Sequence, residues 1–352
     1  MLATSFLSAA ESNEYSTPTV AGHVECTYSA QTGCWSAPRF VESPFLQVHG
    51  LASGLHYGQQ VYEGLQAYRT AANDILIFRP GSNAARMAHS AAAVSMPAVP
   101  ESLFSKSIHM AVALNARYIP PHDFAGSLYI RPFQFGSSCQ IGLEPPDEFM
   151  FCVFVQPHIA FHGHGALRAL VAEEFDRAAT RGTGNVKVGG NYAPVIRWSQ
   201  AAKKQENGAW GVLLHVDSKT QTFIDEFSTS AFIGIIHPKE GEATGATPTV
   251  VFADSPAAIK SVTADSVAQL ATSFGWNVEK RTVKIDDLST FTEVLAAGTA
   301  AGLVPVCCIR HESADWTFEF LPGGSGYQKL WDTLKGIQRG EVEDSFGWCE
   351  RL

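Results

Sequence analysis

The feature that most constrains the fold is a repeated alternation of short apolar segments with longer segments of helical periodicity. Residues 75–80, 127–136 and 148–156 are short runs rich in apolar, β-branched and aromatic residues, a pattern that predicts strands. Between the strand-like runs, residues 83–94 and 102–118 place apolar side chains at helical spacing, which predicts helices. We therefore expect the first half of the chain to form an α/β domain with some α+β character.

A second domain is expected beyond residues 157–165, PHIAFHGHG, where proline, glycine and histidine follow an apolar segment and favour a connection. After this segment, helical patterns at 192–208 and 263–275 alternate with apolar segments at 211–217 and 222–236. A chain of 352 residues also suits two domains of ordinary size better than a single core.

These patterns divide the chain into four parts. We predict a flexible N-terminal arm at 1–22, a small α/β domain at 23–156, an interdomain connection at 157–166 and a large domain at 167–352. Hydrophobic residues make up 45% of the chain and charged residues 17%, which fits well-packed domains and argues against extensive disorder. Apart from the arm, most of the chain should fold.

Charge and cysteine content argue against several classes of function. The net charge is −9 and no long run of lysine or arginine occurs, which argues against nucleic acid as a partner. The N-terminus lacks the basic start of a signal peptide, and no stretch is long enough to span a membrane, so we expect a cytoplasmic protein without a membrane partner. Seven cysteines, an odd number without metal-ligand spacing, predict reduced thiols and no metal site.

Lys187 is the first candidate for chemistry. It lies in NVKVGGNY, where the two glycines that follow let the backbone approach a ligand closely. A lysine that attacks a carbonyl group must be neutral part of the time, which proteins achieve by desolvating it or by placing it near other positive charge. The same short pattern also fits a turn with a solvated lysine, so the motif alone leaves both interpretations open.

Four further stretches could bind a cofactor. Asp225 and Glu226 interrupt an apolar strand, and a carboxylate facing a pyridine nitrogen would keep that nitrogen protonated; a solvent-facing acidic pair is the alternative. Arg86, on the first turns of a helix, suits a phosphate group or is an exposed helix arginine. Thr263, at an expected N-cap, and Thr299, in a small loop, would each offer backbone N–H groups to an anion.

Taken in order, these segments resemble the branched-chain amino acid aminotransferases, a family of fold-type IV pyridoxal-phosphate enzymes. Several long motifs occur in register, which is far more specific than any single lysine. The motifs are GCWSAPRF, LHYGQQVYEGLQAYR, FRPGSNAARM, LYIRPFQFG, KVGGNYA, DEFSTSAFIG, SVTADS and GTAAG. The resemblance implies the two-domain fold-type IV architecture, pyridoxal 5'-phosphate as cofactor, and a cofactor-binding role for the large domain.

The resemblance also implies a role for each candidate residue. Lys187 resembles the lysine that holds the cofactor as a Schiff base and moves the substrate proton, Glu226 the partner of the pyridine nitrogen, and Tyr192 the partner of the ring oxygen. The residues that resemble the phosphate-binding set are Arg86, Val262, Thr263 and Thr299. The residues that resemble the substrate-binding set are Tyr57, Thr299 and Ala300 for the carboxylate, and Tyr62, Tyr129 and Arg131 for the side chain.

The implied activity is amino-group transfer between a hydrophobic, branched-chain-like L-amino acid and 2-oxoglutarate by a ping-pong mechanism. The implied assembly is a homodimer in which segment 137–146, SSCQIGLEPP, of a partner subunit closes the pocket.

Several alternatives stay open. D-amino acid aminotransferases, amine transaminases and aminodeoxychorismate lyases share the lysine and the glutamate. The chain could be a fold-type IV transaminase of specialised metabolism that acts on another amine or amino acid, or a catalytically weakened binding protein that retains the fold. The sequence departs from the family pattern at Ala231, Ser261 and Ala264, near the expected cofactor support.

Overall fold

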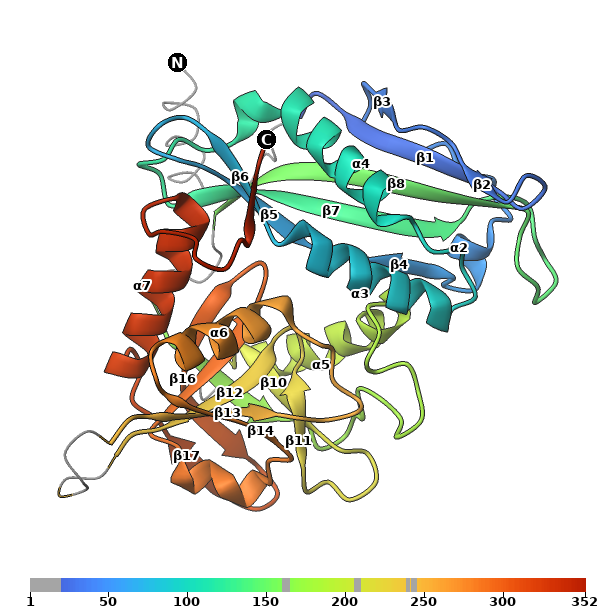
Figure 1. Cartoon of the computed structure of the whole chain (residues 1–352). Coiled ribbons are helices and arrows are strands. Elements are labelled where there is room, and N and C mark those ends of the chain that lie inside the picture. Colours follow the sequence, from blue (N-terminus) through green and yellow to red (C-terminus); the bar gives the residue numbers. More distant parts are fainter. Residues whose placement is uncertain (1–19, 160–164, 206–209, 239–240, 242–245) are drawn as a thin grey trace. The chain divides into compact units, whose positions relative to one another are not determined.

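The computed structural model describes residues 20–159, 165–205, 210–238, 241 and 246–352, and the chain forms two compact units (Figure 1). One unit comprises Met1–Ala160 with Gly336–Leu352, and the other comprises Phe161–Lys335. Residues 1–19 of the predicted arm and 160–164 of the predicted connection lie outside the described residues.

One sheet forms the framework of the first unit. Its strands are β1 (His23–Ser29), β2 (Cys34–Trp35), β3 (Arg39–Val41), β4 (Gln60–Tyr62), β5 (Leu65–Arg69), β6 (Ile75–Phe78), β7 (Gly126–Gly136), β8 (Glu148–Ile159) and β18 (Cys349–Arg351). They lie in the order β18–β6–β5–β7–β8–β1–β2, with β3 beside β1 and β4 beside β7. The long antiparallel pair β7–β8 forms the centre of this sheet, and it arises from two of the strands that the sequence predicted.

Two long helices cover a face of this sheet (Figure 1). They are α3 (Pro80–Ala93) and α4 (Glu101–Leu114); the shorter turns are α2 (Ser53–His56) and the 3-10 helix η1 (Ala116–Tyr118). Pro80 suits the first turn of α3 because its fixed φ is helical and its missing N–H is not needed there. Helix α4 buries Phe104, Ile108 and Ala111, whose spacing places them on one helix face.

The C-terminal strand joins the first unit. Strand β18 pairs with β6, where Cys349 lies opposite Phe78. The sequence had assigned these last residues to the large domain, 167–352, because a strand of three residues carries no signal of a partner so distant along the chain. Strand pairing instead ties Gly336–Leu352 to the unit formed by the N-terminal residues.

A second sheet forms the framework of the other unit. Its strands are β9 (Leu167–Val171), β10 (Val212–Val216), β11 (Ile224–Phe227), β12 (Ala231–Ile236), β13 (Thr249–Ala253), β14 (Asn277–Arg281), β15 (Glu293–Gly298), β16 (Gly302–His311) and β17 (Trp316–Glu319). They lie in the order β11–β10–β9–β16–β15–β12–β13–β14, with β17 beside β16. The helices are α5 (Ala193–Lys203), α6 (Val262–Ser273) and α7 (Ser325–Arg339), with 3-10 helices η2 (Gly189–Asn191) and η3 (Ile285–Thr290).

An aromatic core fixes the strand that carries Glu226. The apolar run 222–236 divides into β11 and β12 at a tight turn in which Phe227 pairs with Ser230. Phe227 and Phe232 flank this turn with ring centroids 5.7 Å apart, and Phe291 lies 5.8 Å beyond Phe232. Because these rings are buried and close-packed, they fix the position of the turn and of β11 in the sheet.

Three properties of the described residues bear on function. No helix among them is long and apolar enough to cross a membrane. No cluster of three or more histidine, cysteine or acidic side chains in the described part of the chain could hold a metal ion. All seven cysteines are described, and none of them forms a disulfide in this structure.

Candidate active site

Lys187 is held at the start of a short helical segment of the second unit. Val186 and Val188 on either side of it are buried and anchor the backbone, while the Asn191 side-chain amide donates to the Val186 carbonyl oxygen at 3.0 Å. The half-buried Lys187 Nζ lies 3.3 Å from the Tyr192 hydroxyl oxygen. The solvated-turn alternative therefore fails, because the lysine is enclosed and has a phenol beside its amine.

Glu226 is buried in the same unit and is paired with a cation. Its carboxylate is 4% exposed; Oε1 lies 2.5 Å from Arg177 Nη1 and accepts the backbone N–H of Ile259 at 3.4 Å. Burial raises the pKa of Glu226 to about 7, although the charges of Arg177 and Lys187 and the Ile259 N–H oppose the rise. Such a carboxylate can share a proton with a ring nitrogen near neutral pH.

Asp225 and Glu226 have separate partners. Successive strand residues point to opposite faces of a sheet, and Asp225 accepts a hydrogen bond from Ser255 Oγ, not from Arg177. Both carboxylates are almost fully buried, so the alternative of a solvent-facing acidic pair is wrong. Glu226 is the one that shares its surroundings with Lys187.

Arg177 is a site residue that sequence reasoning missed. It is 7% exposed, and its Nη1 also donates to the carbonyl oxygens of Gly184 and Ala257 at 3.3 and 3.4 Å. A Cβ on Gly184 would lie 2.4 Å from the Ala178 side chain and 2.5 Å from the Ala257 oxygen, which explains a glycine there. A lone arginine in a polar loop gives no sequence signal, but a buried glutamate implies a cation nearby.

His215 also belongs to these surroundings. It lies opposite Glu226 in the β10–β11 ladder and is fully buried, with Nε2 3.0 Å from the Ser228 hydroxyl. Burial, with the positive charge of Arg177, lowers the pKa of His215 to about 3, so the ring is neutral at physiological pH. Because the His215 imidazole is neutral, Arg177 is the cation that pairs with Glu226.

The N-terminus of α6 supplies backbone donors. Ser261, not Thr263, is the N-cap: its Oγ accepts the Ala264 N–H at 3.1 Å, so the predicted N-cap at Thr263 is wrong. Ser261 has the extended backbone that an N-cap requires, whereas Thr263 already lies inside the helix. The first N–H groups of a helix have no acceptor within the helix, and they make a helix N-terminus suited to an anion.

The second unit therefore gathers groups that fit pyridoxal phosphate. Lys187 and Tyr192 lie together, and Lys187 is near enough to Glu226 to influence the Glu226 pKa. The chain then runs from Ile259, which donates to Glu226, to the α6 N-terminus three residues later. The amine suits the cofactor's aldehyde, and the phenol suits its ring oxygen. The buried carboxylate suits the ring nitrogen, and the helix N-terminus suits the phosphate.

Thr299 and Ala300 form the turn between β15 and β16 of the second unit. Thr299 is half-buried and Ala300 exposed. A Cβ on the preceding Gly298 would lie 2.9 Å from Ser230 Oγ, so this turn runs close to the one that follows β11.

Arg86 belongs to the first unit and is held by a buried acid. Its Nε and Nη2 donate to the two carboxylate oxygens of Glu63 at 2.7 and 2.6 Å, and Asn83 adds a third donor at 2.8 Å. The Arg86 side chain is 11% exposed, so the alternative of an exposed helix arginine is wrong. Glu63, which the sequence analysis did not single out, orients this guanidinium group by a bidentate contact.

Tyr62, Tyr129 and Arg131 form one cluster on the first sheet. The Arg131 guanidinium lies 4.8 Å from the Tyr62 ring centroid and 5.2 Å from that of Tyr129, and its Nη2 donates to the Tyr129 hydroxyl at 3.1 Å. A Cβ on Gly64 would lie 2.1 Å from that hydroxyl, so the glycine makes room for the tyrosine. Arg131 is exposed at the edge of this cluster.

Tyr57, five residues before Tyr62, contacts a loop. It is 48% exposed, and its hydroxyl donates to the carbonyl oxygen of Ile141, within segment 137–146. The Gln140 N–H also donates to the Leu51 carbonyl oxygen at 3.0 Å, which ties the loop to the chain near Tyr57. The predicted role of Tyr57 in binding the substrate carboxylate stays a prediction.

Comparisons with known proteins agree with this geometry. The family described as amino-transferase class IV matches residues 60–309. The chain is 70% identical to aminotransferase TOXF of Cochliobolus carbonum, covering 95% of this chain and 92% of that protein. It is 64% identical to aminotransferase apf4 of Gibberella fujikuroi, covering 95% and 88%.

Solved structures show the same fold. The Escherichia coli branched-chain amino acid aminotransferase has a TM-score of 0.71 at 22% identity, covering 89% of this chain and 96% of that one. The Thermobaculum terrenum branched-chain amino acid aminotransferase, in its pyridoxal-phosphate form, has a TM-score of 0.74 at 19% identity, covering 95% and 98%.

The chain belongs to the class IV amino-transferases. It is a pyridoxal-phosphate-dependent aminotransferase of fold-type IV whose substrates are amino acids and 2-oxo acids. The predicted α/β fold, family and cofactor are confirmed, and the alternative of a binding protein without enzymatic activity is set aside.

Proposed function

We propose that the protein transfers an amino group between a hydrophobic, branched-chain-like L-amino acid and 2-oxoglutarate by a ping-pong mechanism, with Lys187 as the Schiff-base lysine. The observation that carries the proposal is the cluster of the first unit, in which the Arg131 cation lies against the rings of Tyr62 and Tyr129. One surface thus combines apolar walls with a single positive charge.

The residues of the second unit supply the proton chemistry of this proposal. When bound, pyridoxal phosphate provides the electron sink that makes the substrate Cα–H acidic. In each half-reaction Lys187 Nζ would move one proton between the substrate Cα and C4' of the bound cofactor, away from Cα with the amino donor and onto Cα with the 2-oxo acid. The Tyr192 hydroxyl lies 3.3 Å from this amine. Glu226, backed by Arg177, accepts the hydrogen bond of the protonated ring nitrogen.

The cluster of the first unit supports a dual specificity. In a ping-pong reaction the amino donor and the 2-oxo acid bind in turn, so one pocket must accept both. The rings of Tyr62 and Tyr129 suit a hydrocarbon chain, whereas Arg131 suits the distal carboxylate of 2-oxoglutarate through a charge-assisted hydrogen bond. Because Arg131 is exposed, its charge stays hydrated when an apolar substrate is bound.

A second candidate is a fold-type IV transaminase of specialised metabolism that acts on another amine or amino acid. The relatives at 70% and 64% identity are named aminotransferases without a substrate. The branched-chain names belong to structures at 22% and 19% identity, a likeness that extends to the fold alone. This difference supports testing amino donors beyond the branched-chain set.

We also propose a homodimer. Segment 137–146 carries Ile141 and Leu143, and Leu143 is 88% exposed. Leu51, Leu55 and Phe45 of the same unit are exposed as well. An apolar surface of this kind supports burial against a second copy of the chain. Light scattering of the purified protein tests it: wild type should be a dimer, and Leu143→Asp should shift the mass toward the monomer. A wild-type monomer contradicts the proposal.

A substrate panel tests the proposed activity. Purified holoenzyme is mixed with single amino acids, and the change of the cofactor's absorption is followed before and after 2-oxoglutarate is added. Leucine, isoleucine and valine should convert the cofactor to its amino form, and 2-oxoglutarate should return it. Conversion by other amines alone favours the second candidate, and failure of 2-oxoglutarate to restore the spectrum contradicts the proposed acceptor.

A further inference from the structure

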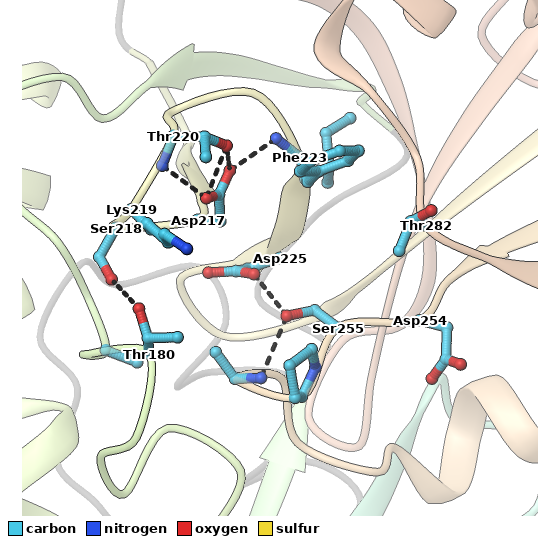
Figure 2. Close-up of a pocket in the computed structure, with 14 residues that line it drawn as sticks. Thr180, Asp217, Ser218, Lys219, Thr220, Phe223, Asp225, Asp254, Ser255 and Thr282 are labelled. Carbon is cyan, nitrogen blue, oxygen red and sulfur yellow. Dashed lines mark hydrogen bonds between the residues drawn. The ribbon is translucent and has the colours of Figure 1, made fainter.

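A cavity of about 330 Å³ lies within the second unit (Figure 2). Its walls are the loop with Ala178 and Thr180, the turn 217–220, part of β11 and the segment 254–257. Asp225 lines it, whereas the adjacent Glu226 does not. None of the described residues that line the cavity belongs to the proposed cofactor or substrate sets, so the cavity is a separate feature of this unit.

The lining is acidic. Asp217, Asp225 and Asp254 are part of it, and Lys219 is the basic residue among the described lining side chains. Lys219 is exposed and forms no ion pair with the described residues, so its flexible ammonium group can stay in water. The cavity therefore presents more negative than positive charge to an occupant.

Asp225 is the group in this lining that lacks a full set of partners. Its side chain is 4% exposed, and Figure 2 shows its carboxylate between Ser255 and Lys219. Among the described residues Ser255 is its sole hydrogen-bond donor, at 2.5 Å to Oδ1. Asp217 differs, because the backbone N–H groups of Thr220, Thr222 and Phe223 all donate to it. Figure 2 shows the second carboxylate oxygen of Asp225, a residue of the cavity lining, on the side away from Ser255.

Burial changes the acidity of the Asp225 carboxyl group. Desolvation raises the pKa of Asp225, because one hydroxyl donor does not replace the water that a carboxylate loses. A ligand with N–H donors and a positive charge would replace the hydrogen bonds and the solvation that the carboxylate loses on burial.

We propose that this cavity binds a small organic cation, an alkylammonium or alkylguanidinium group on a short apolar body, with Asp225 as its anchor. The cation donates charge-assisted hydrogen bonds to Asp225, and the apolar body packs against Phe223, Ile224 and Pro256. A metal ion fits less well, because the described residues contain no cluster of three or more acidic, histidine or cysteine side chains able to hold one.

Calorimetric titration of the holoenzyme with n-butylguanidinium chloride tests the proposal. A guanidinium group is chosen because it does not condense with the cofactor aldehyde as an amine would. We expect saturable binding with one site per chain, and binding of the neutral analogue n-butylurea weaker by about tenfold or more. Saturating 4-methyl-2-oxopentanoate should leave the dissociation constant unchanged, because the 2-oxo acid occupies a different site.

Variants locate the bound cation. Asp225→Asn should weaken binding of the cation by about tenfold or more, because it removes the charge and keeps the shape. Thr282→Trp, at an exposed position of the lining, should block the cavity without touching Asp225, which keeps the test valid if Asp225→Asn folds poorly. Asp123→Asn, an exposed aspartate of the first unit, loses the same charge and should bind as wild type.

Several results would overturn the proposal. Equal affinity for the cation and the urea would show that charge plays no part. Unchanged binding in both Asp225→Asn and Thr282→Trp would place the ligand elsewhere, and displacement by the 2-oxo acid would place it in the active site. No saturable binding to a holoenzyme that is active in transamination would also reject the proposal, whatever the outcome for the substrate panel.

Discussion

The polar residues around Glu226 in the second unit and those around Arg131 in the first unit are held in opposite ways. In the second unit Glu226 and Arg177 are 4% and 7% exposed, and each has fixed partners in the surrounding backbone and side chains. In the first unit Arg131 is exposed and lies on the faces of two tyrosine rings, and Tyr57 is 48% exposed. One region is fixed by burial, and the other is accessible.

This difference suits the two proposed tasks. Removing one partner of a buried ion pair leaves an unpaired charge in the protein interior, which destabilises the fold by about 3–5 kcal/mol. We therefore expect Glu226 and Arg177 to tolerate little change. An exposed cation on an aromatic face contributes only about 0.5–1 kcal/mol, so it can be exchanged without loss of the fold. We therefore expect substrate preference to change through the cluster around Arg131 and the chemical step to depend on the buried residues around Lys187 and Glu226.

Removal of the lysine gives the largest expected effect. Lys187→Ala should lower turnover by at least about a thousandfold, because it removes the amine that is proposed to move the substrate proton. Borohydride reduction of the holoenzyme followed by peptide mass spectrometry should find the cofactor on Lys187, and Lys187→Ala should show no adduct. Lys203→Ala, on α5, is the matched control and should behave as wild type. An adduct on another lysine would refute the assignment.

The buried carboxylates give the next largest effect. Glu226→Gln should slow removal of the Cα proton by about 10²–10³-fold, because it removes a charge aimed at the ring nitrogen. Asp225→Asn should have little effect on this rate, since its hydrogen bond is to Ser255 in a different environment. Single-turnover kinetics with deuterated leucine measures the step. Equal losses in the two variants would contradict separate roles.

A smaller effect is expected where the first unit is tightly packed. Gly64→Ala should lower stability by about 1–3 kcal/mol, because its Cβ would collide with the Tyr129 hydroxyl. KM values should rise more than kcat falls, since Tyr129 holds Arg131 by a hydrogen bond and Arg131 is proposed to bind substrate. Thermal melting and steady-state kinetics check this. Gly33→Ala, with nothing within 4 Å of its Cβ but a positive φ of 66°, is a control for backbone strain alone.

If Gly64→Ala and Gly33→Ala have the same effect on KM, the displacement of Tyr129 is not what alters substrate binding.

The smallest effect concerns the cap of α6. Ser261→Ala should lower stability by about 1 kcal/mol, because the Ala264 N–H loses its side-chain acceptor. Thr263→Val keeps the shape of a residue inside the helix and should have a smaller effect. Differential scanning calorimetry of the holoenzymes compares the two. A larger loss for Thr263→Val would restore Thr263 as the cap.

The sequence predicted the parts of this enzyme that depend on local pattern. Helix α4 was expected because Phe104, Ile108 and Ala111 recur at helical spacing. Strands β7 and β8 were expected because their short runs are rich in apolar, β-branched and aromatic residues. Lys187 was found because the glycines that mark it follow directly in the sequence, and because other segments of the chain resemble motifs of the same family.

The parts that the sequence did not predict depend on distant partners. Arg177 lies near Glu226 only after β11 and the loop before Lys187 are folded. Glu63 orients Arg86 from the short link between β4 and β5, twenty-three positions away. Strand β18 likewise has its partner β6 far back in the chain. The N-cap of α6 was misplaced by two residues because both Ser261 and Thr263 carry hydroxyl groups that suit an N-cap.

The central claim is that the buried residues around Lys187 and Glu226 govern the chemical step for every substrate, whereas the exposed cluster around Arg131 selects among substrates. Stopped-flow measurement of the separate half-reactions with leucine and with glutamate, in Glu226→Gln and Arg131→Met, tests it directly. We predict that Glu226→Gln slows both half-reactions by the same factor, and that Arg131→Met weakens the glutamate half-reaction by about tenfold or more while leaving that with leucine nearly unchanged. A uniform loss in Arg131→Met, or a drop in its Tm with no change in preference, would mean that Arg131 braces the fold and would contradict the claim.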